Sequence, residues 1–129
     1  MKLSAAAVVL GLLLAALPAA AHHSFAAEYD REKPIKLTGT VNRFDMTNPH
    51  SWIYIDVKDA DGKVVTWAFE TASPSNLYRR GFRKDTVRAG EIVTIEGYLA
   101  KDGTHTGNAQ RLTMGDGKQY ILGTEQNPG

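Results

Sequence analysis

The sequence predicts an all-β fold, mainly β with one short helix, and two patterns support this prediction. Apolar and polar residues alternate in six short runs, as expected for strands with one face on a core and the other in water. Turn-forming groups such as 59–62 (Asp-Ala-Asp-Gly) and Asp102-Gly103 separate neighbouring runs. Only one segment has the end signals of a helix, so an all-β class is favoured over α/β and helical classes.

The order of the elements indicates the architecture. The expected strands are 35–45, 52–58, 64–70, 92–101, 108–114 and a short 119–122. The turn at 59–62 makes a hairpin of the second and third strands. Ser73 and Pro74 begin a short helix that ends before Gly81, between the third and fourth strands. Five principal strands with a helix at this position predict a small five- to six-stranded OB-like Greek-key barrel.

The first 21 residues have the features of a cleaved signal peptide. Lys2 precedes the apolar run 3–17, and Pro18 is followed by three alanines that suit a signal peptidase. We expect cleavage after Ala21, export to the periplasm and no transmembrane anchor in the mature protein.

The mature chain is expected to hold one domain. A flexible N-terminal segment at 22–34 precedes the barrel at 35–122, and 123–129 forms a disordered tail.

Composition excludes several classes of function. The chain has 15 Lys and Arg against 14 Asp and Glu, and loss of Lys2 with the signal peptide leaves a formal net charge of zero. A neutral domain lacks the basic surface that nucleic acid requires, so nucleic acid is not an expected partner. The absence of cysteine rules out disulfides and cysteine-based metal sites.

Cleavage after Ala21 would give His22 a free α-amine beside its own imidazole, and this pair of nitrogens is the strongest candidate site. The two groups titrate near neutral pH, and a metal that favours nitrogen ligands in a square plane is Cu(II). His23 can add a second imidazole, and His50 or His105 can complete the set. We therefore hypothesise a Cu(II) site with the ligands His22, His23, His50 and His105, in decreasing order of support.

Each of these histidines also has an ordinary interpretation. His22 and His23 can be a terminal segment with only incidental copper affinity. His50 follows an Asn-Pro turn, where its ring can bond loop backbone, and His105 lies at a hairpin tip, where side chains are normally exposed.

A metal-independent interaction module is the alternative function, with an unknown protein or a small ligand as its partner. Trp52, Tyr54 and Trp67 can form an aromatic surface on the barrel, and Arg79 and Arg80 belong to a basic cluster around the helix. Packing within the sheet and a solvated basic face are the ordinary interpretations of these residues.

The sequence offers no sign of an enzyme. It has no nucleophile elbow, no His-Glu-x-x-His helix and no evident carboxylate pair. Asp59-x-Asp61 imitates part of an EF-hand, but Lys63 occupies its fifth ligand position. We expect a non-enzyme.

Several motifs together resemble a domain-of-unknown-function family of small secreted proteins from Gram-negative bacteria. They are the His-His-Ser-Phe start at 22–25, Thr-Asn-Pro-His-Ser-Trp at 47–52 and Trp-Ala-Phe-Glu at 67–70. The resemblance implies a periplasmic β-barrel and no particular activity. The expected start at His22 is also similar to that of periplasmic copper-resistance carriers, which are small β proteins. This chain departs from them because it has no His-x-His pair and no methionine-rich segment.

Overall fold

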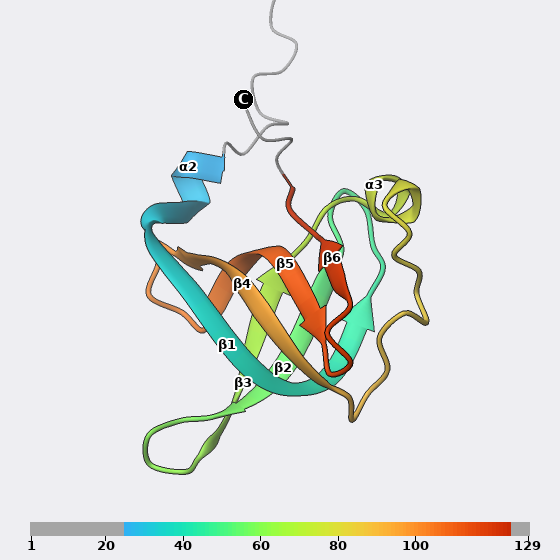
Figure 1. Ribbon diagram of the computed structural model, residues 1–129. Helices are drawn as coiled ribbons and strands as arrows, with labels where there is room; N and C mark the ends of the chain where they lie inside the picture. The colour runs from blue at the N-terminus through green and yellow to red at the C-terminus, as the bar shows by residue number, and fades with distance from the viewer. Residues whose placement is uncertain (1–24, 125–129) are drawn as a thin grey trace, which may run out of the picture.

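The computed structural model describes residues 25–124, which form one barrel with two short helices (Figure 1). The elements in chain order are α2 (Phe25–Glu28), β1 (Tyr29–Asp45), β2 (Trp52–Lys58), β3 (Val64–Glu70), α3 (Pro74–Arg79), β4 (Ile92–Ala100), β5 (Thr106–Met114) and β6 (Gln119–Ile121). Neither helix in these residues is long and apolar enough to cross a membrane.

The six strands form a nearly closed sheet of the OB type, as predicted. Their order is β3-β2-β1-β4-β5-β6, and a parallel pairing between β3 and β5 joins the two ends of the five principal strands. All the other neighbours are antiparallel. The strands closed in this ring, and α3 between β3 and β4, have the arrangement of an OB-like barrel.

Strand β1 belongs to both halves of the barrel. Its first part pairs with β4 up to Thr40, and its last part pairs with β2 from Thr40 onward. Gly39 lies where the two pairings meet, and a Cβ atom there would stand 2.6 Å from the carbonyl oxygen of Asp56. Glycine therefore allows β2 to approach β1 closely at the point where β1 passes from one neighbour to the other.

The core follows the alternation of the strands. Ile53 and Ile55 of β2 are completely buried, whereas Trp52 and Tyr54 lie on the outer face and are half-buried. Phe69, Ile95 and Leu112 bring the facing strands to the same core. The buried apolar cluster consists of Val41, Ile53, Ile55, Phe69, Ala72, Leu77, Phe82, Val87, Val93, Ile95, Ala109, Leu112 and Leu122.

Helix α3 forms where the sequence predicts it. Ser73 caps its first turn by accepting a hydrogen bond from the backbone N–H of Asn76 at 3.4 Å, and Pro74 occupies the first helical position. Gly81 follows the helix with a φ of +82°, a conformation that glycine adopts without strain. Leu77 points into the core and closes one end of the barrel.

Two expected boundaries are wrong within the described residues. Residues 25–34, expected to be flexible, form α2 and the start of β1, because Phe25 and Tyr29 are buried. The four consecutive charged residues at 30–33 break the alternation of apolar and polar residues that predicts a strand. The register of β1 also shifts there, at a bulge. At the other end, Gly123 is buried and Thr124 accepts a hydrogen bond from Asn108, so they are not part of a disordered tail.

The remaining boundaries shift by one or two residues, since β5 begins at Thr106 and β6 ends at Ile121. The expected signal peptide 1–21, His22, His23 and the tail from 125 lie outside the described residues.

Candidate functional site

The loop at 46–51 carries His50 from β1 to β2 and is fixed to the end of β3. The backbone N–H of Ser51 donates to the carbonyl oxygen of Ala72 at 3.2 Å, and the N–H of Thr71 donates back to that of Ser51 at 2.8 Å. Ser51 itself is completely buried. Backbone hydrogen bonds therefore hold His50 beside the last residue of β3.

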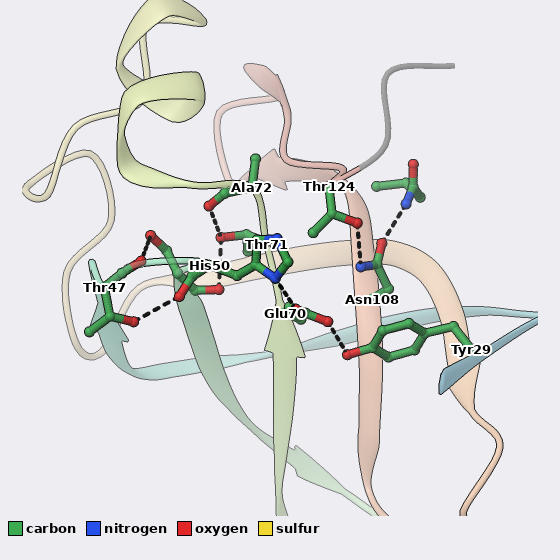
Figure 2. A network of polar contacts seen from close by, with 10 residues as sticks. Tyr29, Thr47, His50, Glu70, Thr71, Ala72, Asn108 and Thr124 are labelled. Carbon is green, nitrogen blue, oxygen red and sulfur yellow. Dashed lines mark hydrogen bonds and ion pairs between the residues drawn. The ribbon is translucent and has the colours of Figure 1, made fainter. Parts of the chain in front are cut away.

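That last residue, Glu70, bridges two partners (Figure 2). Its Oε1 atom bonds Nδ1 of His50, and its Oε2 atom accepts a hydrogen bond from the hydroxyl of Tyr29. Glu70 is 7% exposed and Tyr29 is 4% exposed, whereas the side chain of His50 is 41% exposed. The three side chains form a chain of contacts from two buried residues to a half-exposed one, which we call the His50–Glu70–Tyr29 chain.

Three separate pairings bring these residues together. The β2–β3 hairpin places Trp52 opposite Glu70, so His50 comes just before the paired segment. The closing pairing of β3 with β5 places Glu70 opposite Asn108. Tyr29 reaches the same place from the first residue of β1. The contact of Tyr29 with Glu70 thus requires β1 and β3 to meet in the folded barrel.

Tyr29 is a permanent hydrogen-bond donor in this arrangement. Burial raises the pKa of Tyr29 far above its usual value, and its hydrogen bond to the Glu70 carboxylate raises that pKa further. The phenol therefore keeps its proton at every ordinary pH. One oxygen of Glu70 always receives this proton donor, and the other oxygen is directed at the imidazole.

The contact with Glu70 selects one tautomer of His50. An ionised carboxylate is an acceptor only, so a hydrogen bond to it requires a proton on Nδ1 of His50. In a neutral imidazole with that proton, Nε2 has the free lone pair. Within residues 25–124 His50 has no hydrogen bond through Nε2, and 41% of its side chain is exposed.

The described chain begins beside this arrangement. The ring of Phe25 lies 5.4 Å from the ring of Tyr29 and 5.8 Å from that of Tyr98, measured between centroids. Phe25 is 9% exposed and is thus held against the barrel. His22 and His23 lie outside the described residues.

His105 comes just before β5 and lies beside an earlier part of β3 than Glu70. Its ring is 5.0 Å from the ring of Trp67, and its carbonyl oxygen accepts a hydrogen bond from the N–H of Ala68. Trp67 and Glu70 are three residues apart on the strand, which is roughly 10 Å. No group of three or more metal-ligating side chains exists within the described part of the chain.

The expected aromatic surface does not form as predicted. Trp67 pairs with Ile55 and packs against the core, so it does not share a face with Trp52 and Tyr54. The guanidinium of Arg43 also covers the ring of Tyr54, 3.6 Å from its centroid.

The two arginines of the basic cluster have local partners. Arg79 donates to the side-chain oxygen of Asn76 at 2.6 Å. Arg80 donates to the carbonyl oxygen of Gly123 at 2.8 Å and to that of Ile121 at 3.4 Å. Arg80 thereby fastens the end of β6 to the end of α3.

Sequence reasoning missed Glu70 and Tyr29 as site residues. For Glu70 a signal exists, because a hairpin that turns at 59–62 places residue 70 opposite residue 52, near His50. For Tyr29 no local signal exists, since its partner is 41 residues away in the chain.

Solved structures with a similar fold include the following two. One is a ZRD-deleted mutant of TiaS in complex with agmatine, with 19% identity, a TM-score of 0.48 and coverage of 76% of this chain and 24% of that chain. The other is the mitochondrial single-stranded DNA binding protein Rim1 from S. cerevisiae, with 13% identity, a TM-score of 0.47 and coverage of 72% and 96%. This chain spans about a quarter of the length of the TiaS chain.

No protein with a curated description matches the sequence. Residues 9–110 match DUF6152, which is described as a family of unknown function. This range takes in α2, most of the barrel and all three residues of the His50–Glu70–Tyr29 chain. The chain belongs to the DUF6152 family.

Proposed function

We propose that this protein binds Cu(II) in the periplasm, for carriage or buffering, through Nε2 of His50 and a mature N-terminus at His22. The observation behind this proposal is the contact of His50 Nδ1 with the buried carboxylate of Glu70. Metal-binding histidines almost always donate their second ring N–H to such a partner, which orients the ring and raises the basicity of the ligating nitrogen.

The Tyr29 hydroxyl supports the same interpretation. It holds the second oxygen of Glu70, so the carboxylate cannot rotate without losing a buried hydrogen bond. The imidazole plane of His50 is in turn fixed by Glu70. A ligand that is oriented before the metal arrives loses less conformational entropy on binding.

Nitrogen donors favour Cu(II) over other common metals. His22 would supply its α-amine and imidazole after cleavage, His23 a further imidazole, and His50 the nitrogen from the barrel. Met46 and Met114, which could supply thioethers to Cu(I), are partly buried and pack against the core. His105 is the weakest of the four candidates, because its ring lies against Trp67 and away from Glu70.

The test is a Cu(II) titration of protein whose first residue is confirmed by intact mass, in the presence of a competing chelator. The processed protein should bind one Cu(II) with at least about tenfold higher affinity than the His50→Ala variant, because a ligand is lost. His105→Ala is the matched control and should bind as the parent does. An additional N-terminal Met should weaken binding by blocking the amine of His22.

A free peptide with the sequence His-His-Ser-Phe completes the experiment. If the peptide binds Cu(II) as tightly as the protein, and if His50→Ala has no effect, the barrel contributes no ligand and the proposal is wrong. The metal-independent interaction module then becomes the leading function.

A further inference from the structure

A groove of about 780 Å³ lies on the outer face of the barrel, apart from His50. It runs over β1, β4, β5 and β6, which Figure 1 shows side by side between α2 and α3. Its lining includes Phe25, Lys36, Arg80, Glu96, Tyr98 and Arg111. This volume is within the range of small-molecule sites in proteins.

One part of the groove is cationic. Cross-strand pairing places Lys36 opposite Glu96 and Glu96 opposite Arg111. Each cation stands 3.7 Å from one oxygen of the Glu96 carboxylate, which is longer than a hydrogen bond. The two cations thus share a single carboxylate without a hydrogen bond to it. We call these three residues the Lys36–Glu96–Arg111 row.

Arg80 adds a further cation to the same lining. Its guanidinium holds two carbonyl oxygens of the β6 segment, which fixes its position without cancelling its charge. The groove therefore has an excess of positive charge although the whole chain is nearly neutral. A local excess of this kind matches an anionic group.

The other part of the groove is aromatic. Phe25 and Tyr98 meet edge to face at its α2 end, with an angle of 90° between their rings. Tyr98 is two residues from Glu96 along β4, roughly 7 Å, so the aromatic and cationic parts are separated by about one small ring system. Ile121 of β6 adds an apolar side chain that is 52% exposed.

We propose that this groove binds a small organic anion, a carboxylate or phosphate attached to a planar or apolar body. The body would lie against Tyr98, which Phe25 supports edge to face, and the anionic group would contact Lys36 and Arg111. Arginine suits this role because its planar donors match the oxygens of a carboxylate or phosphate. The site is independent of Cu(II) and of His50.

The test uses anilinonaphthalene sulfonate, a fluorescent aromatic anion, as the probe. Its dissociation constant is measured by fluorescence titration of the purified protein. Phenyl-naphthylamine, which has the same aromatic groups without the sulfonate, is the probe for apolar contact alone. The protein should bind the anionic probe at least about fivefold more tightly than the neutral one, because only the anion meets the cationic row.

Three variants give effects of different sign. Lys36→Gln and Arg111→Gln should each weaken binding of the anion about three- to fivefold, because one cation is lost. Glu96→Gln should strengthen it, because the competing carboxylate is removed. Arg79→Gln, which alters a neighbouring arginine outside the groove, should leave it unchanged. Partly unfolded proteins bind this dye more strongly than native ones, so the near-UV circular dichroism of Glu96→Gln must match that of the parent before the affinities are compared.

Competition by benzoate and by phenyl phosphate then shows which anionic group is preferred. If both probes bind alike, or if Glu96→Gln and Arg111→Gln change the affinity for the anion in the same direction, charge does not govern binding and the proposal is overturned.

Discussion

Two glutamates in this protein each stand between two partners, in opposite surroundings. Glu70 is 7% exposed and is bound on both oxygens by hydrogen bonds. The side chain of Glu96 is 35% exposed, and its two cations stand at 3.7 Å without hydrogen bonds. Burial makes the first carboxylate a fixed support for His50, whereas solvent leaves the second free to exchange partners. The same residue type can therefore orient a ligand in one place and compete with a ligand in another.

Stability should show the largest difference between these two glutamates. Glu70→Ala removes the acceptor of the buried Tyr29 hydroxyl and should lower the free energy of unfolding by about 2–4 kcal/mol. Glu96→Ala, at an exposed pair, should change it by less than about 0.5 kcal/mol. Urea unfolding followed by circular dichroism measures both. Equal losses in the two variants would contradict the contrast.

The second-largest difference between the two glutamates should be in their effect on Cu(II) affinity. Glu70→Gln keeps the size of the side chain but weakens its hold on His50, so Cu(II) affinity should fall about tenfold or more. Glu96→Gln should leave it unchanged. The chelator competition described above gives both values. A fall of similar size in Glu96→Gln would mean that overall charge, and not the orientation of His50, governs copper binding.

The pH dependence of stability should distinguish Tyr29 from an exposed tyrosine. The pKa of Tyr29 is raised in the folded protein above the usual tyrosine value of about 10, so the unfolded chain loses this proton first as pH rises. The stability due to the protonated phenol is complete below pH of about 10 and is lost above it. Urea midpoints between about pH 8 and pH 11 should fall steeply for the parent and less steeply for Tyr29→Phe. Tyr78→Phe, at a side chain that is 58% exposed, should follow the parent.

Salt should produce the smallest effect and only at the exposed site. Raising NaCl from about 0.05 to about 0.5 M shortens the screening length severalfold and should weaken binding of the anionic probe a few fold. The stability difference between the parent and Glu70→Ala should stay constant, because a buried hydrogen bond is screened little. A salt-independent affinity for the probe would point to apolar contact alone.

The sequence predicts the barrel better than it predicts these sites. Alternation and turn residues locate β2, β3 and α3, and even the position of Glu70 follows from the hairpin turn at 59–62. The start of β1 cannot be predicted from the sequence, because four consecutive charges at 30–33 break the alternation. The Lys36–Glu96–Arg111 row cannot be predicted for another reason. It depends on the strand order β1-β4-β5 and on a register that shifts near Glu96. Local patterns locate strands but not which strands become neighbours.

The contact between Tyr29 and Glu70 joins positions 41 residues apart and depends on β1, β3 and the closing β5 together. A metal held by His50 would accordingly favour only the complete barrel over any partly folded state, in proportion to its concentration and affinity. Binding of the ion would stabilise the whole domain against unfolding, and the melting temperature would rise with the fraction of protein that holds the metal. The stability of the fold would then depend on the concentration of the metal, because resistance to unfolding would rise and fall with its supply.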